Sequence, residues 1–100
     1  MNNIALMTDI EILKMIAERA KVSRIHHNLR QIDLHKKSGV PLSSIRVFER
    51  TGTISFSHLV KISRVLEEIE ILGTLFAEKT PLDIEIMAKE HSKKRQRVRK

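Results

Sequence analysis

The chain has 100 residues, which suits one domain with a modest core. Apolar residues make up 41% of it but include only three phenylalanines and no Tyr or Trp, a composition that favours packed helices. The absence of cysteine excludes disulfides, thiolate zinc sites and a cysteine nucleophile. No apolar run approaches the roughly 20 residues of a membrane span, and the amino terminus lacks the order of a secretory signal. We therefore expect a soluble cytoplasmic protein with no membrane partner.

The net charge of +7 is unevenly distributed. Six of the 19 basic residues lie in the last eight positions, and they are Lys93, Lys94, Arg95, Arg97, Arg99 and Lys100. The remaining chain holds 13 basic and 12 acidic side chains, so any DNA surface on it must come from charge placement. We expect residues 93–100 to be a disordered basic tail that adds DNA phosphate contacts, with a merely solvating tail as the alternative.

Helix signals begin at Thr8, which forms a capping-box pattern with Glu11. Residues 1–8 then form an N-terminal extension, and a long helix runs from Asp9 to about His27. Apolar residues recur along it at helical spacing, at Ile12, Met15 or Ile16, Ala20 and Ile25.

A second helix is expected over Leu29 to Lys37, closed by Gly39, because glycine readily adopts the left-handed conformation that ends helices. Pro41 suits the first turn of a third helix that runs to about Arg50 and is broken at Gly52.

Ser55 can cap a fourth helix with an apolar stripe at Leu59, Ile62 and Leu66. A break near Glu67 separates it from a fifth helix that continues to Phe76. Thr80-Pro81 predicts a sixth helix from Leu82 to about Glu90. No strand pattern appears, so the expected class is all-α with five or six helices.

The segment after Leu66 carries more apolar residues than one helix face can bury. We expect residues 79–92 to be a C-terminal helical segment, and a dimer or partner surface to include Ile69, Leu72, Leu75, Phe76, Leu82 and Ile86. The alternative is that this apolar surface covers the long first helix.

The third helix divides sharply between two sides. With Ile45 facing inward and about 100° per residue, Phe48 falls on the same side. The opposite side carries short and cationic donors, namely Ser43, Arg46, Val47 and Arg50. Leu42 lies about 60° from the Ile45 direction, so helical geometry does not assign it to one side. With the preceding helix and its glycine turn, this is a helix-turn-helix arrangement.

Over residues 16–75 the chain resembles the Cro/cI-like, or XRE, family of helix-turn-helix DNA-binding domains. The matching stretches are IAERAKVSRIHHNLRQ and SGVPLSSIRVFERTGTIS. The resemblance implies a lambda-repressor-like domain over residues 9–78. It also implies base-contacting positions at Gln31, Leu42, Ser43, Ser44, Arg46 and Val47.

Further roles follow from the same resemblance. Arg30 and Arg50 match phosphate-contacting positions, and Gln31 is expected to touch phosphate and support a recognition-helix side chain. Arg24 and Glu49 match a buried or half-buried ion pair between the first and third helices. His35 departs from the family, which has Ala or Gly where the two motif helices pack closely, so the ring is expected to lean outward or to open the crossing.

The basic ending and FERTGTISFSHLVKISRVLE resemble HipB-like antitoxins. That resemblance implies a homodimer on operator DNA that autoregulates its operon and binds a HipA-type Ser/Thr kinase toxin. A stand-alone phage-type or chromosomal repressor and a protein-interaction module remain open. An RNA-binding protein is a weaker option, because the chain has no exposed aromatic pattern for base stacking.

Enzymatic chemistry has little support in the sequence. None of the five histidines has the spacing of a metal site, and neither Ser43 nor Ser44 has a positioned base. The acidic residues are expected to form caps or solvated faces. We therefore predict no enzyme, no metal and no cofactor.

Overall fold

The computed structural model describes residues 3–78 and residue 88. In that part of the chain the elements are a 3₁₀ turn η1 (Ile4–Leu6) and the helices α1 (Asp9–His26), α2 (Gln31–Ser38), α3 (Leu42–Thr51), α4 (Phe56–Val65) and α5 (Ile69–Leu72). The described residues contain no strand, so the expected all-helical class is confirmed for them. None of their helices is long and apolar enough to cross a bilayer.

The α1 helix begins where the capping pattern predicts. The Thr8 Oγ1 accepts a hydrogen bond from the Glu11 N–H at 3.2 Å, and the Glu11 Oε1 accepts one from the Thr8 N–H at 2.9 Å. This reciprocal pair satisfies two N–H groups that the first helical turn leaves without a partner. The helix ends at His26, with His27 as its C-cap.

The expected start of the second helix at Leu29 is wrong by two residues. Asn28 adopts a left-handed φ of 60°, and Arg30 is the extended N-cap of α2. The Leu29 N–H donates to the Arg24 carbonyl at 3.1 Å, which places it in the link from α1. The other end follows the prediction, because Gly39 closes α2 with a φ of 79°.

The start and end of α3 and the start of α4 also lie at the residues that the sequence predicts. Pro41 is the N-cap of α3, and Gly52 ends that helix with a φ of 88°. The Ser55 Oγ caps α4 by accepting from the His58 N–H at 3.2 Å.

The chain breaks after α4 as expected, with Glu67 at a positive φ of 60°. The expected continuation of a fifth helix to Phe76 is wrong, because α5 ends at Leu72 and Phe76 adopts a φ of 57°. Since Ile71, Leu75 and Phe76 are all exposed, no burial compensates for the entropy of extending this helix. The sixth helix expected over Leu82 to Glu90 lies outside the described residues, apart from Ala88.

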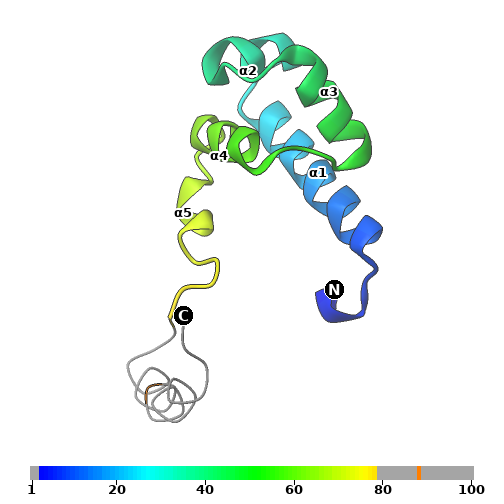
Figure 1. Cartoon of the computed structure of the whole chain (residues 1–100). Coiled ribbons are helices and arrows are strands. Elements are labelled where there is room, and N and C mark those ends of the chain that lie inside the picture. The colour runs from blue at the N-terminus through cyan, green and yellow to red at the C-terminus, as the bar shows by residue number, and fades with distance from the viewer. Residues whose placement is uncertain (1–2, 79–87, 89–100) are drawn as a thin grey trace.

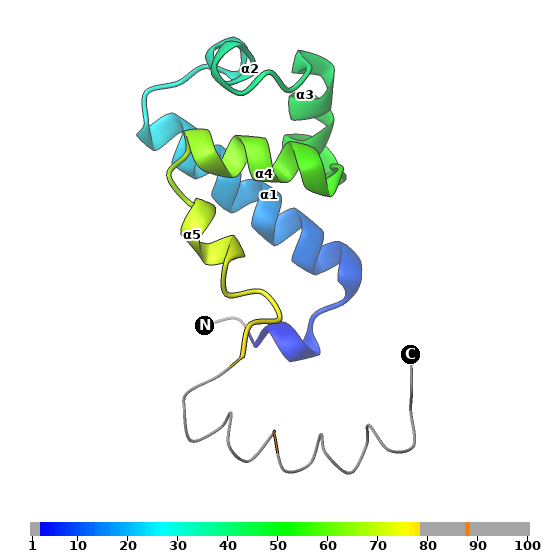
Figure 2. The same ribbon diagram turned by 60° about the vertical axis from the view of Figure 1, so that its left-hand side comes forward.

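The helices surround one apolar core. Its fully buried members are Ala17, Leu34, Val40, Ile45, Phe48, Ile62 and Leu66. The α3 helix packs on α1 and α2, and α4 packs on α2. Figures 1 and 2 show α2 at one end of the molecule, while η1 and the segment after α5 lie at the opposite end.

The expected apolar stripe of α1 is only partly right. Ile25 is 54% exposed and Ile16 is also exposed, whereas Ala17 is buried and was not predicted. The buried residues of α1 are one small side chain, Ala17, and one charged side chain, Arg24, which bonds to Glu49 on α3. Hydrophobic periodicity cannot detect such a pair, because a charged residue interrupts the pattern.

Gly52 lies against the backbone of α1. A Cβ atom at this position would sit 2.6 Å from the Leu13 carbonyl carbon, carbonyl oxygen and Cβ, whereas a Cβ at Gly39 would meet nothing within 4 Å. Both glycines have a left-handed φ, so only the steric contact distinguishes them.

We expect Gly39→Ala to lower the free energy of unfolding by about 1–2 kcal/mol, the cost of a left-handed non-glycine residue. Gly52→Ala should cost about 2–5 kcal/mol, because overpacking adds to that strain. Urea unfolding of the two variants measures the difference. Equal losses would show that α1 and the end of α3 separate without cost.

Candidate nucleic-acid interface

The exposed side of α3 carries the residues that the helical rotation placed there. Ile45 and Phe48 are buried in the core, as predicted. On the other side Ser43, Arg46, Val47 and Arg50 are all exposed. Leu42 and Ser44 are half-buried, so they lie at the border between the two sides. One side of α3 thus exposes a strip of hydroxyl, guanidinium and methyl groups to solvent.

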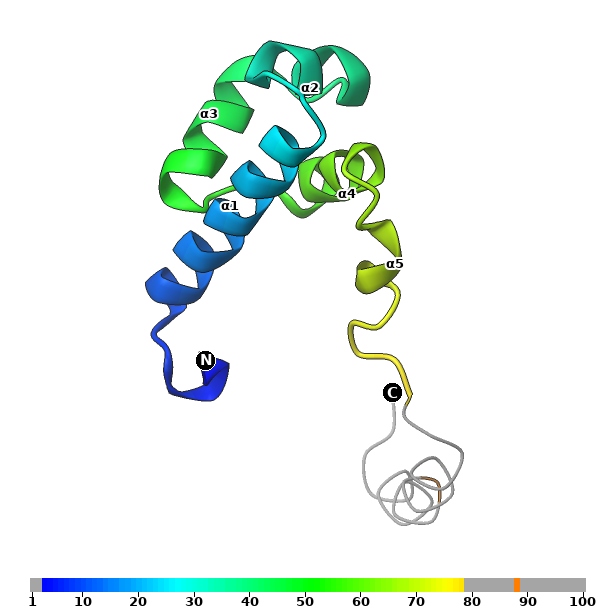
Figure 3. The ribbon, with the colours of Figure 1, turned by 180° about the vertical axis from the view of Figure 1, so that it is seen from behind.

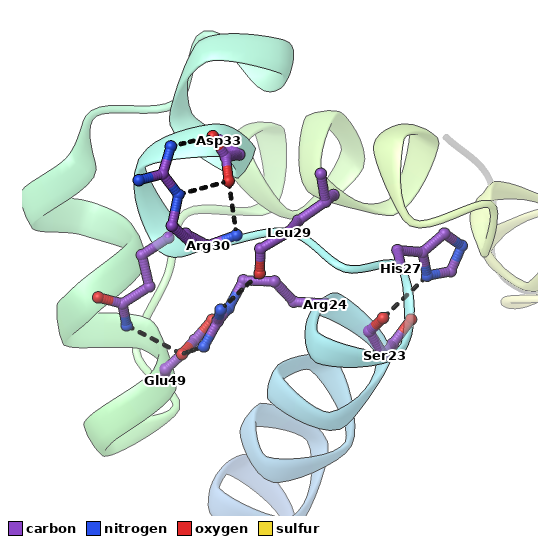
Figure 4. Close-up of polar contacts among 8 residues, drawn as sticks. Ser23, Arg24, His27, Leu29, Arg30, Asp33 and Glu49 are labelled. Carbon is purple, nitrogen blue, oxygen red and sulfur yellow. Dashed lines mark hydrogen bonds and ion pairs between the residues drawn. The ribbon is translucent and has the colours of Figure 1, made fainter.

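The orientation of α3 depends on an ion pair with α1. The Arg24 Nε lies 2.6 Å from the Glu49 Oε2, and the Arg24 Nη2 lies 3.0 Å from the Glu49 Oε1. The side chains of Arg24 and Glu49 are only 10% and 6% exposed. The Arg24 Nη1 also donates to the Leu29 carbonyl at 2.8 Å, which ties the link between α1 and α2 to the same group (Figure 4).

Gln31 completes this network. Its Nε2 donates to the Glu49 Oε1 at 2.9 Å, and its side chain is half-buried. The Glu49 carboxylate therefore accepts three hydrogen bonds, from residues at the end of α1 and the start of α2. Gln31 was expected to touch phosphate and to support a side chain of the third helix. In the structure the Gln31 side chain bonds to a side chain of the third helix, that of Glu49.

His35 makes a contact that neither expectation described. Its Nδ1 lies 2.7 Å from the Val40 carbonyl oxygen, in the turn between α2 and α3. A carbonyl can only accept, so Nδ1 carries the proton. The Ser38 Oγ accepts from the Val40 N–H at 3.1 Å, so the buried Val40 has both backbone groups bonded. The imidazole thus holds the turn between α2 and α3, and its ring is half-buried.

Arg30 at the start of α2 forms a bidentate pair with Asp33. The Arg30 Nε lies 2.9 Å from Oδ2 and the Nη2 lies 3.0 Å from Oδ1, while the Arg30 backbone N–H donates to Oδ2 at 2.8 Å. The hydrogen bonds from the guanidinium and then from the backbone N–H lower the pKa of Asp33 to about 2. The carboxylate is therefore ionised at neutral pH. The Arg30 side chain remains 77% exposed.

A hollow of about 380 Å³ lies beside α3. Its lining residues are Ser43, Ser44, Val47, Thr53, Ile54, Ser55 and His58. Four of these, from Thr53 onward, were not among the predicted site residues. Thr53, Ile54 and Ser55 lie in the short link between α3 and α4, whereas no sequence pattern pointed to His58 on α4.

The predicted dimer or partner residues lie away from this strip. Ile69 and Leu72 are half-buried in α5, whereas Leu75 and Phe76 are exposed beyond it. In Figures 1 and 3 this segment leaves the molecule at the end opposite α2. Leu82 and Ile86 lie outside the described residues, as do the tail residues Lys93, Lys94, Arg95, Arg97, Arg99 and Lys100.

Comparison with protein-family models, with curated proteins and with solved structures finds no match to the chain. Across residues 3–78 and 88, no three His, Asp or Glu side chains are grouped so that they could hold a metal ion.

Removing either partner of the Arg24–Glu49 pair should strand a nearly buried charge. We expect Arg24→Met and Glu49→Leu each to lower the free energy of unfolding by about 3–5 kcal/mol. The double variant should lose much less than the sum, because it leaves neither charge unpaired. Urea unfolding measures all three, and additive losses would contradict the coupling.

Proposed function

We propose that the protein is a sequence-specific DNA-binding repressor whose α3 helix enters the major groove. The observation that carries this proposal is the exposed strip of α3, held in one orientation by the three hydrogen bonds to Glu49. The major groove admits an α-helix and presents a distinct donor and acceptor pattern for each base pair. A rigidly held helix with a few outward polar groups suits that task.

The chemistry of the strip supports specific roles. Arg46 can take guanine O6 and N7 in a bidentate fork, while Val47 suits a thymine methyl group. Ser43 is a permissive donor or acceptor. Leu42 and Ser44, at the border, would contact bases only near the start of the helix.

Phosphate contacts would fix the register of the helix in the groove. Arg30 and Arg50 are exposed at the start of α2 and near the end of α3. The basic residues 93–100 would add contacts that depend strongly on salt.

Replacing Arg46 tests this function directly. We expect Arg46→Ala to weaken operator binding by about 1–3 kcal/mol and to relax the preference at one base pair, with unchanged thermal stability. The matched control is Arg19→Ala, which removes the same charge from an exposed position on α1. Footprinting and fluorescence anisotropy on the protein's own promoter give the measurement. Equal effects of the two variants, or an unprotected promoter at low salt, would reject the proposal.

A second observation favours a protein partner for the opposite end of the molecule. The segment after α4 exposes Ile71, Leu75 and Phe76, and the Phe76 ring lies outside the core. We infer a homodimer contact here, since helix-turn-helix repressors read paired half-sites as dimers.

The HipB-like features extend the proposal to an autoregulating antitoxin with a HipA-type kinase partner. A stand-alone repressor is the alternative, and a kinase-like toxin in the neighbouring reading frame would decide between them.

Replacing an exposed ring should affect association and leave the fold intact. We expect Phe76→Ser to shift the monomer–dimer equilibrium toward monomer at least tenfold, about 1.4 kcal/mol, since an aromatic side chain is a large apolar contact. Its melting temperature at high dilution should match that of the parent. Phe56→Ser, at the exposed start of α4, is the control. Sedimentation equilibrium that shows the same association for both variants would rule out this surface.

A further inference from the structure

The start of α2 holds a cation that is already paired. Arg30 is one of the two arginines within residues 3–78 that are expected to meet phosphate, yet both oxygens of Asp33 lie within 3.0 Å of its guanidinium nitrogens. A guanidinium has five N–H groups in a rigid planar fork. Two of them point to Asp33, and the other three have no hydrogen bond within the described residues.

Three hydrogen bonds join Arg30 to Asp33. Oδ2 also accepts the Arg30 backbone N–H, so the Asp33 carboxylate is held by the helix start as well as by the guanidinium. The free side of the fork points away from Asp33 (Figure 4), and the Arg30 side chain is 77% exposed. The next residue, Gln31, is bonded to Glu49, so this part of α2 is tied to α3.

We propose that Asp33 is a positioning residue for DNA recognition, which orients the Arg30 fork toward one phosphate and balances its charge. This inference rests on the proposed DNA-binding function. It assigns Asp33 a role beyond capping α2: Arg30 contributes directed hydrogen bonds to the phosphate while the pair adds little net charge to the interface. Phosphate contacts of that kind fix register and do not strengthen undirected attraction.

The consequence is a higher ratio of specific to non-specific affinity. Attraction of free positive charge to DNA is independent of sequence and rises with each phosphate neutralised, with a salt slope of about −0.9 per contact. An unpaired Arg30 would therefore raise the affinity for any duplex. An Arg30 paired with Asp33 raises the affinity mainly for a duplex on which α3 is already in register.

The test uses full-length protein and fluorescence anisotropy on two duplexes, the protein's own promoter and a random sequence, over a series of KCl concentrations. Asp33→Asn removes the charge and keeps an oxygen that can accept the Arg30 N–H. Asp33→Gln is a second neutral variant, because Gln is a natural capping-box residue at this helix position. Asp33→Glu keeps the charge. Glu18→Gln on α1 removes one exposed carboxylate elsewhere.

We expect the two neutral variants to bind the random duplex several-fold tighter, by up to about tenfold at 0.1 M salt, with a slope steeper by up to about 0.9. Promoter affinity should rise less, so the specificity ratio falls. Asp33→Glu should keep the wild-type slope and ratio. In ¹⁵N spectra the Arg30 Nε–H signal should be sharp in the wild type and broadened in the neutral variants.

The outcomes distinguish the role of Asp33 from the proposed DNA-binding function. Unchanged slope and ratio in the neutral variants, or changes equal to those of Glu18→Gln, would overturn the role of Asp33 and leave the proposed function standing. Failure of the wild-type protein to bind either duplex at low salt would overturn the proposed function and this inference with it.

Discussion

The Glu49 carboxylate is the group on which the arrangement of the first three helices depends. It lies on α3, and its three hydrogen bonds come from Arg24 at the end of α1 and Gln31 at the start of α2. Burying a carboxylate is costly unless its oxygens are hydrogen-bonded and its charge is paired. Here both conditions are met, and no buried side-chain nitrogen or oxygen in the described part of the chain lacks a partner. The network therefore favours one relative position of the three helices over alternatives that would leave a charge unpaired.

Two further contacts constrain α3 along its length. At its start, His35 and Ser38 bind the backbone of Val40 and fix the turn from α2. At its end, Gly52 allows the chain to pass against the Leu13 backbone. Between these points Ile45 and Phe48 fill the core. A helix held at its start, middle and end presents its outer strip as a fixed surface, which is the property that the proposed reading of base edges requires.

The two ends of the molecule differ in chemistry. The α2–α3 side carries cations and hydroxyl groups, whereas the opposite side carries exposed apolar residues on η1, the first half of α1 and the segment after α4. Since residues 1–92 are nearly neutral overall, the proposed DNA interface depends on where charges lie more than on how many there are. The Arg30–Asp33 pair shows the same principle locally, because a cation at the interface is balanced by its own neighbour.

The sequence by itself determined the features that depend on a few adjacent residues. These features are the capping box at Thr8, the cap at Ser55 and the left-handed glycines Gly39 and Gly52. Each acts within one turn of the chain, so the local order of residues is enough to predict it. The division of α3 into a buried and an exposed side followed from helical geometry alone. Only the family resemblance predicts the Arg24–Glu49 contact, because the partners lie 25 positions apart in the chain.

Only the tertiary structure decided the remaining features, because each depends on a neighbour that is distant in the chain or on burial that no local pattern specifies. The folded chain buries Ala17 of α1 in the core and leaves Ile25 of the same helix exposed. Gln31 turns to Glu49 because the folded chain brings α3 beside the start of α2. The α5 helix stops at Leu72 because nothing in the described chain covers the apolar residues beyond it. The apolar spacing predicts a longer helix there, but a helix this short is stable only where packing supports it.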